Sequence, residues 1–300
     1  MTRRVVWVVC GALLLGACAA TETTRGEDGT PPVAVAGTKA TSGVVTVVAA
    51  GDIADDADDG RGTARLIRSM APDAVLALGD NAYDDGSAAE YREKYDPTWG
   101  RFKAITRPVP GNHEYHTRGA AGYFEYFRRQ VRGNAYYAWD AGSWRMYALN
   151  CEIDCGPGSA QLTWLRADLA NHANRPALAY VHQPLFTCST KHDPYQLLKP
   201  VWAALQRRSG RIMLAGHNHS YERFATQDAT GARDADGLRQ FVVGTGGKGH
   251  YELTSSCRNR QAGNDTASGV LKLELGSRFY WWQFISVGGR VLDEGRGSAT

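Results

Sequence analysis

The sequence predicts an α/β fold in which two stacked, mixed β-sheets are flanked by helices. From residue 43 onward, apolar strand-like runs alternate with amphipathic stretches, an order that implies a parallel sheet with covering helices. From residue 238 onward, strand-like runs instead follow one another directly. The sequence shows no internal repeat and no boundary between two domains, so residues 43–297 are expected to form one domain.

The first part of this region alternates between strands and helices. Strands are expected at 44–50, 73–79 and 107–111, where short apolar runs end in glycine or a polar residue. The amphipathic stretches 62–70 and 87–102 predict helices between these strands. The chain therefore begins in βαβαβ order.

The remaining elements follow the same reasoning. Helical spacing predicts helices at 161–173 and 194–208, and apolar runs predict strands at 177–182 and 211–216. The C-terminal strands are expected at 241–247, 269–275, 279–287 and 289–295.

Length, composition and charge describe an ordinary globular protein. The chain has 300 residues, of which 43% are hydrophobic and 22% charged, so a sizeable core can form. The formal net charge is +3, and the basic residues are spread along the chain. Because nucleic-acid binding usually requires a basic stripe, no nucleic-acid partner is expected.

The N-terminus carries the features of an export signal. Two arginines precede a short apolar run that is too short for a confident membrane span. The run ends in LGAC (15–18), which resembles a bacterial lipobox in which Cys18 becomes lipidated; simple cleavage after small residues is the alternative. Residues 1–18 are expected to be the signal and 19–42 a flexible tether. The protein is therefore expected outside the cell or on its surface, on the periplasmic side if an outer membrane is present, with a lipid anchor as its one membrane contact.

Four cysteines lie beyond the expected signal. An even number in an exported chain favours disulfide bonds, for which three connectivities are possible. Spacing suggests that Cys151 pairs with Cys155 and Cys188 with Cys257. A metal site built on CEIDC is the competing interpretation.

Possible metal ligands follow five of the predicted strands directly. Each ending alone is ordinary, because a GD turn commonly caps a helix and a single histidine is commonly packed or solvated. Carboxylate, amide, phenolate and imidazole groups all bind hard or borderline cations, and seven such groups are too many for one ion. The pattern predicts two ions about 3.5 to 4 Å apart. The candidate ligands are Asp52, Asp80, Tyr83, Asn112, His182, His217 and His219.

These residues resemble the calcineurin-like metallophosphoesterase superfamily. The matching blocks are GD at 51, GDNAY at 79, GNHE at 111, the strand ending at His182, and GHNH at 216. Most members have a metal-binding histidine where this chain has Ala54, whereas purple acid phosphatases lack it and supply a tyrosine, here Tyr83. The resemblance is thus to the purple acid phosphatase branch and implies a four-layer α/β/β/α fold.

The resemblance also implies a dinuclear centre and a reaction. Fe(III) would be bound by Asp52, Asp80, Tyr83 and His219, and a divalent ion (Zn, Fe or Mn) by Asp80, Asn112, His182 and His217. Asp80 would bridge both ions. The implied activity is hydrolysis of small phosphomonoesters through attack by a metal-bound hydroxide. The alternatives are a phosphodiesterase or nucleotidase on the same centre, and a non-catalytic surface protein that binds phosphate or a partner.

Three further residues match positions near the substrate in this branch. His113 matches a residue that contacts phosphate oxygens, and Glu114 is expected to hold its ring. His192 is expected to protonate the leaving alkoxide, because an imidazole titrates near neutrality. The alternative for His192 is a solvated loop histidine.

Two other motifs are given no catalytic role. The acidic run at 55–60 lacks the ligand pattern of a calcium loop and is expected to be solvated. GTGGKG at 244–249 lacks the Walker spacing and is expected to form a tight turn.

Overall fold

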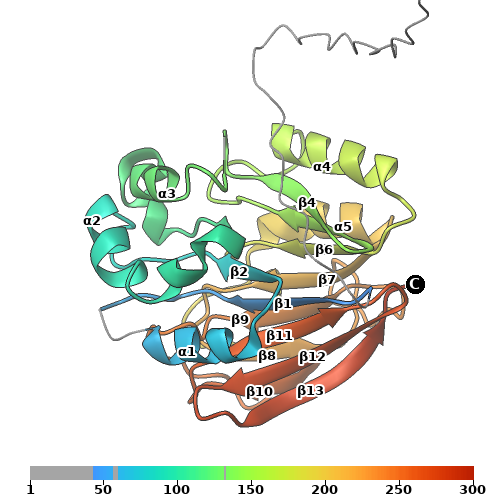
Figure 1. The fold of residues 1–300 in the computed structure, drawn as a ribbon. Coiled ribbons are helices and arrows are strands. Elements are labelled where there is room, and N and C mark those ends of the chain that lie inside the picture. The colour runs from blue at the N-terminus through green and yellow to red at the C-terminus, as the bar shows by residue number, and fades with distance from the viewer. Residues whose placement is uncertain (1–42, 57–59, 132) are drawn as a thin grey trace, which may run out of the picture. The chain divides into compact units, whose positions relative to one another are not determined.

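The computed structural model describes residues 43–56, 60–131 and 133–300. The expected signal, lipobox and tether therefore lie outside the described residues. No helix within the described ranges is long and apolar enough to cross a membrane. Figure 1 shows two stacked sheets with helices at their sides, as the sequence predicted.

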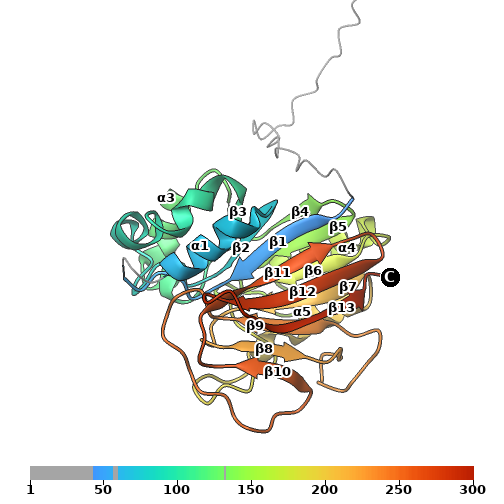
Figure 2. The ribbon, with the colours of Figure 1, turned by 60° about the horizontal axis from the view of Figure 1, so that its bottom comes forward.

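The first sheet has the order β13-β12-β11-β1-β2-β3. β1, β2 and β3 are parallel, whereas β11 pairs antiparallel with both β1 and β12, and β12 pairs antiparallel with β13. Figure 2 shows β1, β11, β12 and β13 side by side. The strands are β1 (Val45–Ala50), β2 (Ala74–Leu78), β3 (Thr106–Val109), β11 (Gly269–Leu275), β12 (Phe279–Ser286) and β13 (Val291–Ser298).

The second sheet has the order β10-β8-β9-β7-β6-β5-β4. Its centre, β5-β6-β7-β9, is parallel, and antiparallel pairs lie at both edges. Both sheets are therefore mixed. The strands are β4 (Tyr137–Ala141), β5 (Trp144–Ala148), β6 (Ala177–Tyr180), β7 (Gly210–Ala215), β8 (Tyr221–Phe224), β9 (Arg239–Val243) and β10 (Arg260–Asn264).

Helices lie on the outer sides of the two sheets. α4 and α5 pack together beside the second sheet, and α1 contacts β11 of the first (Figure 1). The α-helices are α1 (Arg61–Met70), α2 (Ala88–Glu90), α3 (Ala121–Tyr126), α4 (Ala160–Asn171) and α5 (Lys199–Gln206). Turns of 3-10 helix are formed by Trp99–Ile105, His113–Tyr115, Arg118–Ala120 and Gln196–Leu198, and a π-helical turn by Tyr91–Tyr95.

Residues of β7 show how the second sheet is buried on both faces. Ile212 and Leu214 belong to the core between the sheets, whereas Met213 belongs to the core under α4 and α5. Successive strand residues point to opposite faces, so a continuous apolar run fills both cores. Across the sheets, the ring of Tyr221 stacks on that of Phe284 with centroids 4.0 Å apart. These contacts fix the two sheets against each other.

One predicted helix is broken in the structure. The stretch 87–102 forms the short α2, a π-helical turn over Tyr91–Tyr95 and a 3-10 turn that starts at Trp99. Pro97 lies between the last two turns and has no amide hydrogen to continue the helix. The prediction of one regular helix was therefore wrong.

Both predicted disulfide pairs are present, namely Cys151–Cys155 and Cys188–Cys257. The pairing expected from spacing is thus confirmed. The four strands β4, β5, β8 and β10 were not predicted.

Candidate metal centre

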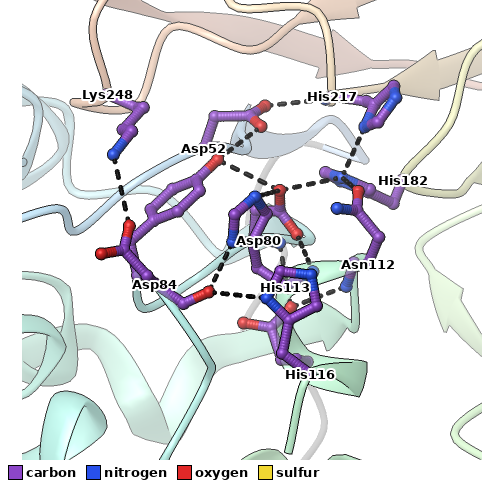
Figure 3. Close-up of polar contacts among 12 residues, drawn as sticks. Asp52, Asp80, Asp84, Asn112, His113, His116, His182, His217 and Lys248 are labelled. Carbon is purple, nitrogen blue, oxygen red and sulfur yellow. Dashed lines mark hydrogen bonds and ion pairs between the residues drawn. The ribbon is translucent and has the colours of Figure 1, made fainter.

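Five strand ends meet at one edge of the stacked sheets. β1, β2 and β3 of the first sheet lead to Asp52, Asp80 and Asn112, and β6 and β7 of the second lead to His182 and His217. Figure 3 shows these side chains pointing toward one another. The structure therefore brings together residues that lie up to 165 positions apart in the chain.

The backbone at these strand ends is unusual and places the side chains inward. Asp52, Asp80 and His217 have positive φ angles of 59°, 46° and 68°. Such conformations are uncommon for residues other than glycine and cluster at functional sites. A Cβ atom on Gly79 would lie 2.5 Å from Nδ1 of His182, and one on Gly111 would lie 2.2 Å from Oδ1 of Asp80. The glycines of the GD and GN motifs thus allow the ligand-bearing loops to approach closely.

The first half of the site surrounds the hydroxyl group of Tyr83. This oxygen lies 3.0 Å from Oδ1 of Asp52, 3.1 Å from Oδ2 of Asp80 and 3.3 Å from Nε2 of His219. Nδ1 of His219 donates to the carbonyl oxygen of Gly249 at 2.7 Å, so Nε2 is the free ring nitrogen. One phenolic proton cannot satisfy three acceptors, and a cation suits this cluster.

The second half surrounds Nε2 of His182. Nδ1 of His182 donates to the carbonyl oxygen of Leu78 at 2.9 Å, which leaves Nε2 free in the neutral ring. Nε2 lies 3.1 Å from Oδ1 of Asn112, 3.2 Å from Nδ1 of His217 and 3.3 Å from Oδ2 of Asp80. One ligand atom each of Asp80, His182 and His217 lies within 4.8 Å of the others, which is close enough to share an ion.

The charges at the site also favour cations. Burial, together with the carboxylates of Asp52 and Asp80, raises the pKa of Tyr83 well above its usual value. Burial lowers the pKa of His182, but the adjacent Asp80 outweighs it and raises this pKa to about 10. The donor set is thus anionic and buried, and the residues present fit two metal ions with Asp80 in contact with both halves.

His113 lies at the edge of this cluster. Its amide donates to Oδ1 of Asp80 at 3.0 Å, and its Nδ1 donates to the carbonyl oxygen of Asp84 at 2.5 Å. Nε2 is left free, 3.9 Å from Oδ2 of Asp80. His116 contacts the same Asp84 oxygen at 3.1 Å through its own Nδ1. The ring of His113 is therefore oriented by Asp84.

Glu114 lies beneath the site and does not play the part expected of it. Its fully buried carboxylate accepts bonds from the amides of Asp80, Asn81 and Gly111 at 3.0, 2.8 and 2.6 Å, and from the hydroxyl of Tyr91 at 3.0 Å. The prediction that Glu114 holds the ring of His113 was wrong. Glu114 instead ties the GDN and GNH loops together.

His192 lies at the mouth of the site. Its half-buried ring has its centroid 4.3 Å from that of His217 and 5.4 Å from that of Tyr251. Burial, followed by the charges of His219 and Lys191, lowers the pKa of His192. The structure thus places His192 next to the expected divalent half.

Three residues near the site were missed in the sequence. Tyr251 stacks on His219 with ring centroids 3.9 Å apart, and Lys248 lies over the ring of Tyr83. Glu152 lies in the loop closed by Cys151 and Cys155, and burial raises its pKa to about 7. Its Oε1 atom is buried and has no hydrogen-bond partner among the described residues. Lys248 lies in the motif GTGGKG and Glu152 in CEIDC, whereas Tyr251 lies in neither.

Comparison with known proteins identifies the family. The sequence model of the calcineurin-like phosphoesterase family matches residues 45–221. Purple acid phosphatase 21 of Arabidopsis thaliana is 27% identical to this chain over 206 residues, which cover 60% of this chain and 45% of that protein. The chain therefore spans less than half the length of this curated relative.

Two solved structures share the fold. Purple acid phosphatase PPD1 from yellow lupin (Lupinus luteus) seeds has a TM-score of 0.69 at 18% identity and covers 85% of this chain and 54% of its own. GAP50, the anchor in the inner membrane complex of Plasmodium, has a TM-score of 0.67 at 11% identity and covers 85% of this chain and 89% of its own. Because the family model covers more than half of the sequence, this chain belongs to the calcineurin-like phosphoesterase family.

Proposed function

We propose that this protein is an exported phosphohydrolase that cleaves phosphomonoesters at a dinuclear metal centre. The observation that carries the proposal is the position of Asp80. Its Oδ2 atom lies 3.1 Å from the hydroxyl of Tyr83 and 3.3 Å from Nε2 of His182, so one carboxylate belongs to both halves of the site. A shared carboxylate between two sets of free donors suits two adjacent ions.

The donor types support Fe(III) in the first half and a divalent ion, Zn, Fe or Mn, in the second. The first half would be formed by Asp52, Tyr83 and His219, and phenolate is a hard anionic donor suited to Fe(III). The second half would be formed by Asn112, His182 and His217, whose neutral donors suit a divalent ion. Two carboxylates and a phenolate supply about −3 against about +5 from the ions, which leaves a site that attracts phosphate. When bound, the ions would acidify water and neutralise charge on the transferring phosphoryl group.

The surrounding histidines would act on the substrate. Nδ1 of His113 donates to the carbonyl oxygen of Asp84, so Nε2 would donate to a phosphate oxygen when the ring is in its doubly protonated form. His192 lies at the mouth, where it would deliver a proton to the leaving alkoxide. Different residues would thus bind the phosphate group and protonate the leaving group.

Export is supported by the two disulfide bonds, because such bonds persist mainly in oxidising compartments. The proposal of a cleaved signal and a lipid on Cys18 is tested by the mass of the mature N-terminal peptide purified from the producing cell.

The reaction itself is tested with matched substrates and variants. The wild-type protein is assayed with p-nitrophenyl phosphate and with its bis ester, alongside Asn112→Ala and a surface variant, Lys272→Met. We expect the monoester to be preferred and Asn112→Ala to lose turnover while folding normally. Preference for the diester would favour the phosphodiesterase alternative. A wild-type protein that binds phosphate but turns over neither substrate would favour a non-catalytic role on the same fold.

A further inference from the structure

The segment Gly246–Tyr251 covers the Tyr83 half of the site from outside. The amide of Lys248 donates to the carbonyl oxygen of Asp52 at 2.9 Å. The next residue, Gly249, accepts the bond from Nδ1 of His219 at 2.7 Å, and the ring of Tyr251 stacks on the His219 ring. One short segment thus contacts two of the three residues that make up the Tyr83 half, through its backbone and one ring.

The glycines of GTGGKG explain how this segment comes so close. A Cβ atom on Gly246 would lie 2.5 Å from the carbonyl oxygen of Gly51, and one on Gly247 would lie 2.1 Å from that of Ile53. Both contacts are with backbone, which cannot move aside easily. The segment therefore packs directly on the loop that carries Asp52, and the start of the Lys248 side chain is fixed in place.

The side chain of Lys248 reaches the third residue of this half. Nζ lies 4.5 Å from the centroid of the Tyr83 ring, 2.6 Å from Oδ1 of Asp55 and 3.6 Å from Oδ1 of Asp84. Figure 3 shows the side chain of Lys248 pointing toward Asp84. Asp55 lies three residues after Asp52 in the chain, and Asp84 lies directly after Tyr83. The ammonium group therefore joins both ligand-bearing loops.

A cation in this position has a direct electrostatic effect on Tyr83. A cation over an aromatic ring is attracted to it, and the attraction grows when the ring carries a phenolate. Tyr83 is fully buried beside two carboxylates. The ammonium group of Lys248 lies over its ring and is itself held by Asp55, so it keeps the ring in place beside these carboxylates.

We propose that Lys248 is a positioning residue for the Tyr83 half of the metal centre, holding the ring of Tyr83 and the loops that carry Asp52 and Tyr83 in place. This inference rests on the proposed dinuclear centre and adds a residue outside its ligand set. The segment GTGGKG then supports the site by packing against the loop of Asp52, in addition to forming a tight turn.

The chain offers a matched control for Lys248. Lys272 on β11 has the same side-chain exposure, 24%, and an ion pair of similar length, 2.7 Å to Oε1 of Glu274. Lys272→Met therefore removes a comparable ion pair away from Tyr83. Lys248→Arg keeps a positive charge near the ring, and Lys248→Met removes it.

Two measurements separate a role at the metal centre from a merely structural one. The first is the rate at which metal is lost to a chelator, measured by elemental analysis of protein whose fold is checked by circular dichroism. Mutation of a residue that holds a metal ligand in place typically lowers metal affinity by about 10- to 100-fold. Lys248→Met should therefore lose metal at least about tenfold faster than wild type. Lys248→Arg should largely restore retention, and Lys272→Met should match wild type.

The second measurement is the visible absorption band of iron-loaded protein. Removal of a positive charge near the ring raises the energy of the phenolate electrons more than that of the more distant iron. Lys248→Met should therefore shift the band to longer wavelength, with no shift in Lys272→Met. If Lys248→Met retains metal as wild type does, the inference is overturned and the dinuclear centre stands. If the wild-type protein retains no metal, both proposals are overturned.

Discussion

Nδ1 of His217 lies 3.2 Å from Nε2 of His182, and the backbone fixes which nitrogen carries the lone pair in the neutral ring of His182. Because Nδ1 of His182 donates to Leu78, its Nε2 faces His217 as an acceptor. In the tautomer of His217 that carries its proton on Nε2, Nδ1 is also an acceptor, and the two nitrogens could hold a cation between them. Oδ2 of Asp80 lies 3.3 Å from the same Nε2 atom, so a shared cation would also be held by this carboxylate.

The position of His192 predicts a dependence on the leaving group. If His192 protonates the leaving oxygen, His192→Ala should lower kcat for alkyl phosphates by about 100-fold, the lower end for general acid catalysis. An aryl phosphate such as p-nitrophenyl phosphate leaves without protonation, so its kcat should fall much less. Steady-state assays with both substrates test this prediction. Equal losses for the two substrates would assign His192 to substrate binding instead.

The buried carboxylate of Glu114 predicts a large effect on stability. Glu114→Gln puts an amide group against the amides of Asp80, Asn81 and Gly111, so at least one buried donor loses its partner. The free energy of unfolding should fall by about 2 to 3 kcal/mol in urea titrations. Glu93→Gln, at an exposed position of the neighbouring turn, serves as the control. A loss no greater than that of the control would show that the donors find other partners.

The disulfide Cys188–Cys257 predicts a link between stability and turnover. It joins residues 69 positions apart and lies at the base of the segment that carries His192. In this segment the amide of Thr190 donates to the carbonyl oxygen of Glu252 at 3.0 Å. Replacement of both cysteines by serine should cost about 4 kcal/mol of unfolding free energy, against about 2 kcal/mol for Cys151–Cys155 because that loop is shorter.

Turnover should fall in the Cys188–Cys257 variant while metal content stays at the wild-type level. Elemental analysis and kcat measured on the same sample test this expectation. Simultaneous loss of metal and activity would show that the disulfide supports the ligands themselves.

Asp293 predicts how the fold responds to acid. It joins β13 to β8, accepting from Nε of Arg223 and from the hydroxyl of Tyr221, both at 2.7 Å. Burial raises the pKa of Asp293, but its bonds to Arg223 and Tyr221 outweigh burial and lower this pKa below 3.8. The unfolded chain therefore binds the proton first, and the stabilisation is lost as pH falls below about 3.8 through the folded value.

Asp293→Asn should thus lose less unfolding free energy than wild type between about pH 5 and about pH 3. Urea titrations at both pH values measure this difference, with the exposed Asp236→Asn as control. If the unfolding free energy of Asp293→Asn fell as much between the two pH values as that of wild type, Asp293 would not contribute to acid unfolding.

The grouping of the candidate ligands could be predicted because its signal is local. Each apolar run that becomes a strand is followed at once by Asp, Asn or His, so Asp52, Asp80 and Asn112 can be grouped from the order of residues alone. Parallel strands place such residues at one edge. The two stacked sheets were predicted from the order of the elements, because strand-like and helical stretches alternate from residue 43 and strand follows strand from residue 238.

Residues that support the centre from a distance were not predicted. Lys248 lies 165 residues beyond Tyr83 in the chain, and its role depends on how closely GTGGKG packs on the loop after β1. The role of Glu114 was mistaken because adjacency to His113 in the sequence suggested contact, whereas the short turn points the two side chains to different partners. Pro97 broke a helix whose apolar spacing alone looked regular.

The measurement that tests the central claim most directly is the metal content of purified protein, combined with its visible spectrum. Two ions per chain are expected, one of them iron, with an absorption band from Fe(III) bound to Tyr83 that disappears in Tyr83→Phe. A protein that holds one ion or none after growth with iron and zinc would contradict the account, because Asp80 would then have no second cation to share.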